Sequence, residues 1–337
     1  MFKAFTLSVF SLVLSFLSLV SFAQEPANQD VAGQRFMPTI SSHAMVVSQD
    51  PIATKIGLDI LKEGGNAVDA AVAMGFAMAV SLPRAGNLGG GGFMLIWLQK
   101  EHKMLALDYR EVAPGSISPQ DFITKDHKVD RHKITGSYLS AGVPGTVMGL
   151  TEAAQKYGSL PLKTLMEPAI ELAENGMVVN QDLALSLLHM QAYLARSHAS
   201  SAVFLHPDGR PYRQGELFRQ KDLAQTLKAI AQKGADGFYR GPVAQRLARA
   251  MARFGGKVTA KDLAHYQAKW RTPVMAPYKG YQIYSMPPPS SGGITLIEML
   301  QILSHFPLAK WGHNSAQSLH VMSEAMNLAY LDRNQYL

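Results

Sequence analysis

Arg110 is the residue whose type and position in this sequence most clearly favour chemistry. It stands at the end of an apolar run, Met104–Tyr109. A guanidinium is planar and can hold a carboxylate through two parallel N–H bonds, for which lysine is a poor replacement. Asp108 and Glu111 lie beside it in the sequence, so an ion pair with a neighbour is the alternative interpretation. The sequence is consistent with both a carboxylate-binding arginine and a structural ion pair.

The other residues that could do chemistry lack the partners that chemistry needs. His127 and His132 lie in a charged loop, but without the spacing of metal ligands, which favours a solvated loop. Ser290 and Ser291 precede two glycines, yet no base lies near them in the sequence, so helix capping is the simpler explanation. We therefore expect no metal site and no cofactor, and no residue of this chain is assigned as catalytic.

Four consecutive glycines, Gly89–Gly92, precede the segment that carries Arg110. Glycine adopts positive φ readily and allows another group to approach the backbone closely. The apolar runs Phe93–Leu98 and Met104–Tyr109 flank a polar turn and predict a β-hairpin. No Gly-x-x-x-x-Gly-Lys-Ser/Thr motif occurs, so this is not a phosphate-binding loop. We expect the glycine bend and the hairpin to place Arg110 at a rigid strand end.

The rest of the sequence predicts a mixed order of helices and strands. Asp50 and Pro51 predict a helix start, and Asn66 predicts the cap of a second, strongly apolar helix. The other segments with a clear pattern are a short strand at 44–48, helices between 151 and 265, a hairpin at 274–286 that turns at 279–280, and helices from 294 and over 316–331. This order predicts an α/β fold of the α+β kind.

Composition excludes several classes of protein. The chain has 337 residues, of which 47% are hydrophobic and 17% charged, which is typical of a globular protein. The 32 basic and 25 acidic residues are scattered, without the basic stripe and interleaved aromatics that nucleic-acid binding requires. The chain has no cysteine, which excludes disulfides and thiol chemistry.

The N-terminus has the pattern of an export signal. Lys3 precedes the uncharged stretch 4–20, and Ala23 provides a small residue for cleavage. We expect residues 1–23 to be a signal peptide, a mature chain beginning at Gln24, and an irregular leader arm at 24–41. An uncleaved membrane anchor is the alternative, since the uncharged stretch is nearly long enough to span. The expected location is the periplasm or the medium.

Five segments give the chain a family resemblance. It resembles the large subunit of the γ-glutamyltransferases (glutathione hydrolases), and the likeness covers residues 42–337. The segments occur in the family's order and are Leu61–Ala73, Gly86–Met94, Asp108–Pro114, Val143–Val147 and Tyr284–Gly293. The resemblance implies an N-terminal-nucleophile hydrolase fold, an αββα sandwich, of which this chain is the N-terminal part.

The same resemblance implies an activity and a set of partners. In the family, a precursor cleaves itself into two subunits, and the new N-terminal threonine of the small subunit attacks the γ-glutamyl bond of glutathione and related compounds. The γ-glutamyl group then passes to water or to an amino-acid or peptide acceptor. Arg110 aligns with the arginine that holds the substrate α-carboxylate. The resemblance implies a heterodimer with the small subunit.

The chain departs from the family at the nucleophile. No threonine in it is followed by Thr or Ser and then His. We expect the sequence to stop before the processing site and the chain to be inactive by itself. Two alternatives remain, a cephalosporin-acylase relative with the same fold, and a non-catalytic periplasmic module that binds amino acids or peptides.

Overall fold

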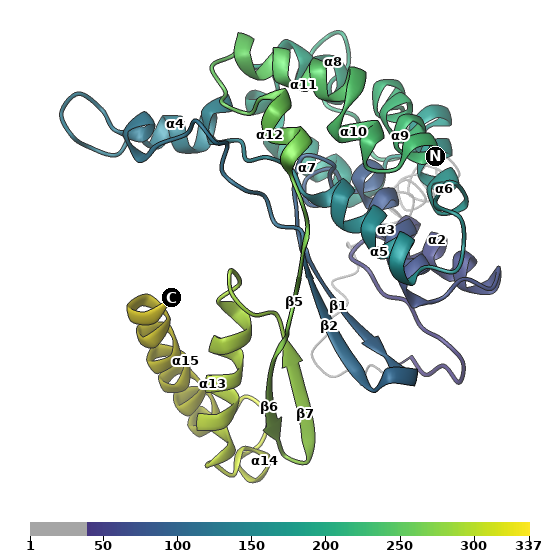
Figure 1. Cartoon of the computed structure of the whole chain (residues 1–337). Coiled ribbons are helices and arrows are strands. Elements are labelled where there is room, and N and C mark those ends of the chain that lie inside the picture. The colour runs from purple at the N-terminus through teal and green to yellow at the C-terminus, as the bar shows by residue number, and fades with distance from the viewer. Residues whose placement is uncertain (1–38) are drawn as a thin grey trace, which may run out of the picture. The chain divides into compact units, whose positions relative to one another are not determined.

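The structure is a computed structural model that describes residues 39–337 (Figure 1). The chain divides into two units, Met1–Ala44 and Met45–Leu337. Residues 39–44 of the first unit contain no helix or strand, and the Ser41 hydroxyl donates to the Ala44 carbonyl. The expected signal peptide and almost all of the expected leader arm lie outside the described residues. No helix in the described part is both long and apolar enough to cross a membrane.

Two helices, α2 (Pro51–Lys62) and α3 (Ala67–Ser81), begin where the sequence predicts. The Asp50 carboxylate accepts from the Ile52 N–H at 3.1 Å, and the Asn66 side chain accepts from two N–H groups of the first turn of α3. The Asp69 carboxylate accepts a hydrogen bond from the Asn66 N–H. It also accepts one from the hydroxyl of Ser159, in the loop after α5. These caps satisfy N–H groups that a helix leaves free at its start.

The short strand expected at 44–48 does not form. The Ser48 N–H donates to the Thr54 hydroxyl of α2 at 3.1 Å instead of to a neighbouring strand. Val46 packs against the core beside α2 and α3. Contacts with the first turn of a helix therefore replace strand pairing here.

A three-stranded antiparallel sheet carries the candidate site, with strand order β1-β2-β5. Strands β1 (Phe93–Leu98) and β2 (Lys103–Asp108) are the predicted hairpin, in which Phe93 pairs with Asp108. Strand β5 (Lys269–Arg271) was not predicted, and it pairs with β2 so that Asp108 lies opposite Lys269. Ile96 and Leu107 of this sheet are buried in the main hydrophobic core.

The middle of the chain is mostly helical, and helices pack around α3. The helices are α4 (Arg131–Gly136), α5 (Thr146–Tyr157), α6 (Leu162–Asn175), α7 (Gln181–Leu194), α8 (His198–Phe204), α9 (Lys221–Lys233), α10 (Asp236–Tyr239), α11 (Gly241–Arg253) and α12 (Ala260–His265). The predicted helices are observed, and three short helices (α4, α8 and α10) and a two-residue strand pair were not predicted. The strand pair is β3 (Met177–Val178) with β4 (Leu217–Phe218).

The C-terminal part consists of a second hairpin covered by helices. Strands β6 (Val274–Tyr278) and β7 (Tyr281–Ser285) are joined by a turn at Lys279 and Gly280, as predicted. Both turn residues have positive φ. Helix α13 (Gly292–Ser304) packs on both strands and on α15 (Ala316–Tyr336), and α14 (Leu308–Trp311) lies between them in the sequence. The three-stranded sheet and the β6–β7 hairpin each pack against helices, which is the α/β class expected.

Candidate functional site

Three backbone segments meet at Arg110. The main chain of Gly92 exchanges two hydrogen bonds with Tyr109, at 3.0 and 3.2 Å. The N–H groups of Gly145 and Thr146 both donate to the Gly90 carbonyl, at 2.8 and 3.0 Å. Just after Arg110 in the sequence, Val112 forms an isolated β-bridge with Val143, which precedes Gly145. The glycine run, the strand exit and the bend before α5 thus form one hydrogen-bonded platform.

The platform needs its glycines because other backbone atoms lie close to them. None of Gly89–Gly92 has positive φ, so the expectation of positive φ was wrong, and the expectation of close approach remains. A Cβ on Gly91 would lie 2.5 Å from the Tyr109 carbonyl oxygen and 2.9 Å from the Arg110 Cα. A Cβ on Gly145 would overlap the same carbonyl oxygen and the Tyr266 hydroxyl. The run therefore lets the main chain of Arg110 pack directly against a neighbouring backbone.

Side chains hold both main-chain polar groups of Arg110. Its N–H donates to Oδ1 of Asp108 at 3.1 Å, and its carbonyl accepts from the Tyr266 hydroxyl at 2.8 Å. Asp108 is buried, and its other oxygen accepts from Nε and Nη2 of Arg271, at 2.8 and 2.7 Å. Arg271 belongs to β5, so the third strand supplies the partner of Asp108.

The guanidinium of Arg110 is exposed and forms no ion pair within residues 39–337. Its Nη1 donates to the Pro289 carbonyl at 3.2 Å, its one hydrogen bond in that part of the chain. Asp108, the neighbour that the ion-pair interpretation requires, pairs with Arg271 instead. Nη2 and Nε of Arg110 thus keep a donor edge free for a ligand.

A cavity of about 460 Å³ opens beside Arg110. Its wall combines the arginine and the acidic Glu111 with apolar side chains from the excursion between β2 and α5. The lining includes Arg110, Glu111, Val112, Ile117, Phe122 and Leu139. A small ligand with a carboxylate would find a guanidinium at one end and apolar walls around it.

The tyrosines beneath Arg110 are kept neutral. Burial raises the pKa of Tyr266, and the nearby Asp108 and Glu111 carboxylates and Tyr109 raise it further. Burial alone raises the pKa of Tyr109, and burial is also the main reason that the pKa of Tyr239 is raised. The Tyr266 hydroxyl therefore stays protonated and donates a hydrogen bond to the Arg110 carbonyl.

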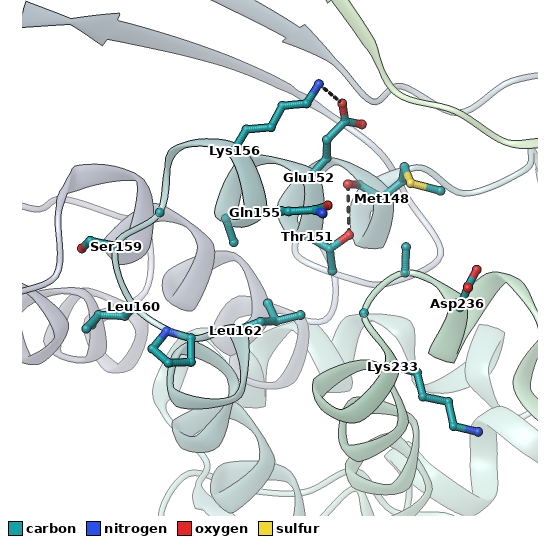
Figure 2. Close-up of a pocket in the computed structure, with 15 residues that line it drawn as sticks. Met148, Thr151, Glu152, Gln155, Lys156, Ser159, Leu160, Leu162, Lys233 and Asp236 are labelled. Carbon is teal, nitrogen blue, oxygen red and sulfur yellow. Dashed lines mark hydrogen bonds and ion pairs between the residues drawn. The ribbon is translucent and has the colours of Figure 1, made fainter. Parts of the chain in front are cut away.

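A larger cavity of about 880 Å³ lies between the end of α5 and the α9–α10 connection (Figure 2). Two of its polar side chains, Glu152 and Thr151, are engaged with the protein. Glu152 forms an ion pair with Lys156 at 2.7 Å and accepts from the Trp270 indole at 2.6 Å. The Thr151 hydroxyl donates to main-chain carbonyls one turn earlier. This cavity does not include Arg110, and its groups stabilise the packing of α5.

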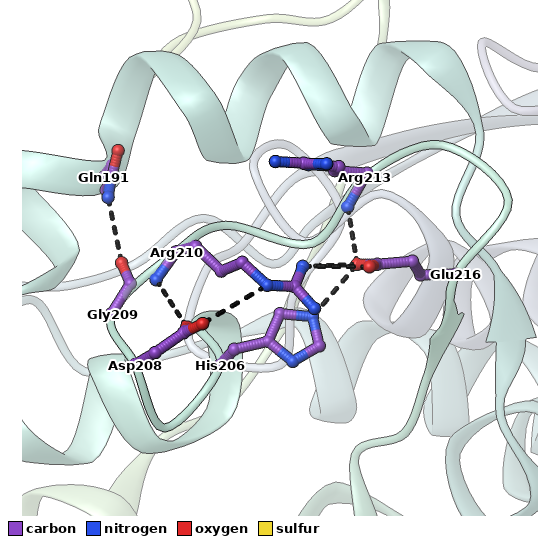
Figure 3. Close-up of polar contacts among 7 residues, drawn as sticks. All are labelled: Gln191, His206, Asp208, Gly209, Arg210, Arg213 and Glu216. Carbon is purple, nitrogen blue, oxygen red and sulfur yellow. Dashed lines mark hydrogen bonds and ion pairs between the residues drawn. The ribbon is translucent and has the colours of Figure 1, made fainter.

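A polar cluster joins the loop between α8 and β4 to the start of β4 (Figure 3). The Glu216 carboxylate accepts from the Arg213 N–H at 2.8 Å, from His206 at 2.9 Å and from Arg210 at 2.9 Å. The backbone bond, followed by those from His206 and Arg210, lowers the pKa of Glu216 to about 2 against a burial effect that raises it. Each donor comes from the same loop, so the cluster fixes local structure.

The other candidates from the sequence do not join the site. His127 and His132 lie on the 123–136 excursion, and within residues 39–337 no three potential ligands gather in a way that could hold a metal ion. The Ser290 hydroxyl accepts from the Gly292 N–H at 3.3 Å at the start of α13, close to the expected capping role. The Ser291 hydroxyl instead accepts from Nε of Arg333 at 2.8 Å and caps no N–H, so that part of the expectation was wrong.

Sequence analysis missed Tyr266 and Arg271 as parts of the site, and it named Asp108 only as a possible ion-pair partner of Arg110. The sequence did contain a signal that Asp108 has a polar partner, because it is a charged residue at the end of an apolar strand. Its partner could not be identified, since β5 is only three residues long and lies far along the chain. Without β5, nothing in the sequence relates Tyr266 to Arg110.

Comparison with known proteins gives consistent matches. Residues 53–337 match the family model described as gamma-glutamyltranspeptidase. The chain is 45% identical over 312 residues to the glutathione hydrolase proenzyme of Escherichia coli, which covers 93% of this chain and 54% of that protein. It is 37% identical over 303 residues to the Acylase ACY 1 proenzyme of Pseudomonas sp. strain SE83, with coverage of 88% and 54%.

A solved structure shares the fold. The crystal structure of Helicobacter pylori gamma-glutamyltranspeptidase superposes with a TM-score of 0.87 at 43% identity, over 89% of this chain and 86% of that chain. The chain spans about half the length of the curated relatives that it matches.

Proposed function

The chain belongs to the gamma-glutamyltranspeptidase family, and from that membership we propose that it forms the substrate-holding part of an enzyme that cleaves γ-glutamyl bonds. The substrates are glutathione and related γ-glutamyl compounds, and the γ-glutamyl group passes to water or to an amino-acid or peptide acceptor. The relative in Escherichia coli is a glutathione hydrolase proenzyme, which supports this substrate class.

The observation that carries the proposal is the state of Arg110. Its guanidinium is exposed at the edge of a cavity, free of carboxylate partners among residues 39–337, and held on a rigid platform. A γ-glutamyl donor carries an α-carboxylate at the end remote from the bond that breaks. Two N–H bonds from Arg110 would fix that carboxylate and so set the position of the γ-carbonyl.

The nucleophile of the proposed reaction is a threonine that this chain does not contain. Its hydroxyl attacks the γ-carbonyl, the amine leaves with a proton, and the γ-glutamyl-enzyme is resolved by water or an acceptor amine. We place this threonine at the start of a small subunit cut from the same precursor. Exposed apolar residues support such a partner, since a sheet face and a helix carry several of them; they are Leu95, Trp97, Leu319, Met322, Met326 and Leu331.

Substituting Arg110→Lys in the full-length precursor tests the proposal. Lysine keeps the charge but loses one of two parallel bonds, and charge-assisted bonds contribute about 1.5–3 kcal/mol. We expect KM for γ-glutamyl donors to rise roughly tenfold to a hundredfold, with self-cleavage intact. Donors without the α-carboxylate should lose much less. Steady-state kinetics on both donor types measures this.

Arg84→Lys is the matched control, because Arg84 is a surface arginine that pairs with Asp182. It should leave KM within about twofold, as exposed ion pairs contribute little. Unchanged KM in Arg110→Lys, or a block of subunit formation in that variant, would show that Arg110 has a structural role only.

The acylase relative favours a second candidate function. An acylase of the same fold would cleave amides that carry an acyl group other than γ-glutamyl. The same kinetic series separates the two candidates. Equal turnover of such acyl amides and of γ-glutamyl donors by the wild-type enzyme would favour the acylase. Membership of an enzyme family argues against a non-catalytic binding module.

Export to the periplasm or the medium is also part of the proposal. It rests on Lys3, the uncharged stretch 4–20 and Ala23. N-terminal sequencing of the protein from its own cells should give Gln24 as the first residue. A first residue within 1–20 would favour the uncleaved anchor instead.

A further inference from the structure

We propose that Tyr266 is a positioning residue for Arg110, and that its hydroxyl sets where the guanidinium meets the substrate carboxylate. The inference rests on the proposed function in one respect, since the ligand of Arg110 is the α-carboxylate of a γ-glutamyl donor. The contact itself is independent of the ligand. The Tyr266 hydroxyl donates to the Arg110 carbonyl at 2.8 Å from a side chain that is only 5% exposed.

Arg110 needs such a partner because regular pairing stops just before it. Strand β2 ends at Asp108, and the last ladder pair on that side joins Asp108 to Lys269 of β5. Tyr266 lies three residues before Lys269 on the antiparallel neighbour, so its long side chain reaches the level of Arg110. The phenol replaces the ladder bond that a longer β5 would have given to the Arg110 carbonyl.

Tyr266 is itself fixed by a second tyrosine. Its ring stacks on Tyr239 with 5.6 Å between centroids and 6° between planes. The Tyr239 hydroxyl donates to the Pro144 carbonyl at 2.8 Å and accepts from the Met148 N–H at 3.2 Å. Gly145 leaves no room for a Cβ against the Tyr266 hydroxyl. The phenol therefore has one available position, and it transmits that position to Arg110.

The other contacts of Arg110 limit the remaining freedom. Its N–H is held by Asp108, and its Nη1 donates to the Pro289 carbonyl. With the carbonyl held by Tyr266, both peptide planes around the Arg110 Cα are fixed, and the side chain leaves the platform in a set direction. Loss of the phenol hydroxyl would free one plane and let the guanidinium sample other positions. That loss should weaken ground-state binding of the carboxylate rather than the chemical step.

The test uses Tyr266→Phe in the full-length, processed enzyme with γ-glutamyl-p-nitroanilide as donor. We expect KM to rise roughly threefold to tenfold, as for loss of one neutral hydrogen bond, while kcat stays within about twofold. Tyr212→Phe is the matched control, because it removes the hydroxyl of a half-buried tyrosine that packs on Phe218, outside the contacts of Arg110 described above. It should leave KM within about twofold.

A double-mutant cycle ties the effect to the arginine. In an Arg110→Lys background, Tyr266→Phe should add less than about twofold to KM, because the bidentate contact that it positions is already lost. Independent, multiplicative effects of the two changes would overturn the proposal. So would equal KM changes in Tyr266→Phe and Tyr212→Phe, which would indicate general loss of packing.

A second readout separates this inference from the proposed function. Amide hydrogen exchange of residues 109–112 should be faster in Tyr266→Phe than in the wild type and unchanged in Tyr212→Phe. An enzyme without γ-glutamyl activity would refute the proposed function, yet the exchange result would still show whether Tyr266 holds this segment. Unchanged exchange in Tyr266→Phe refutes the positioning role whatever the activity.

Discussion

The four glycines at 89–92 contribute unequally to the site. A Cβ on Gly91 would meet three main-chain atoms of the segment around Arg110, within 2.9 Å. A Cβ on Gly89 would meet one atom only, the Asn87 side-chain oxygen at 3.7 Å, which is ordinary contact. Backbone cannot move aside as a flexible side chain can. The requirement for glycine therefore lies at particular positions of the run.

Comparison of Gly91→Ala with Gly89→Ala tests this at the residue scale. Gly91→Ala should destabilise the full-length protein by about 1–3 kcal/mol, because the added methyl forces the neighbouring backbone to shift. Gly89→Ala should stay within about 0.5 kcal/mol, as for open surface substitutions. Thermal unfolding of the two variants beside the wild type gives the comparison. Equal losses of Tm would show that the run needs chain flexibility rather than close approach.

At the scale of elements, the clearest titrating unit is the polar cluster of Glu216 (Figure 3). Its carboxylate has an ordinary pKa of 4.5, which the Arg213 N–H, His206 and Arg210 lower to about 2 in the folded protein. A lowered folded-state pKa means that the stabilisation is complete above 4.5 and is lost as the pH falls toward 2. The connection to β4 should therefore loosen in acid.

Glu216→Gln should reduce the acid dependence of stability. The wild type should lose Tm between pH 4.5 and about 2 more steeply than the variant, since glutamine does not titrate. At neutral pH the variant should be the less stable of the two, because its amide accepts fewer bonds from the loop. Glu63→Gln, at an exposed site after α2, is the control and should follow the wild type. Parallel Tm–pH curves for the wild type and Glu216→Gln would contradict this account.

The elements that sequence analysis predicted are those with local signals. Asp50 with Pro51, Asn66 and the Thr259-x-x-Asp262 pattern each mark a helix start, and each forms the expected cap. The hairpin before Arg110 consists of two apolar runs separated by a short polar turn, so each strand has its partner nearby in the sequence. These elements depend on residues within a few positions of one another, so the sequence contains what determines them.

The elements and contacts that were missed depend on distant residues. Strand β5 has three residues of mixed character and exists because β2 offers it an edge. The frame around Arg110 depends on β5, so the arginine was identified without its supports. The glycine run was predicted to allow positive φ or close approach, and only the packed structure shows that close approach applies.

At the scale of the whole molecule, the described part has apolar side chains that nothing in it covers. Six long apolar residues of α15 are 42–62% exposed, which is more than a helix of a finished core usually leaves; they are Leu319, Met322, Met326, Leu328, Tyr330 and Leu331. Ala325 and Ala329 of the same helix are buried, and α15 packs against α13. Helix α15 therefore resembles a helix that is packed against neighbours on more than one side.

This organisation predicts that residues 24–337 alone do not catalyse the proposed reaction. No threonine of this chain stands in the Thr-Thr/Ser-His context of the proposed nucleophile. Purified chain should release no p-nitroaniline from γ-glutamyl-p-nitroanilide, whereas the processed full-length enzyme should. Steady release by the chain alone would place a nucleophile within it and refute the assignment of the missing threonine.

The contacts that frame Arg110 also have a consequence for the order of events during synthesis. The hydrogen bonds from Tyr266, from Arg271 to Asp108, and from Arg110 to Pro289 close loops of 156, 163 and 179 residues. The ribosome releases the arginine long before any of these three partners, and contacts across so many residues form slowly. While the chain is being made, the helices of the middle segment have time to fold around a hairpin whose third strand is missing. Arg110, the proposed binding residue, is thus among the early residues to emerge and among the last to reach its final position.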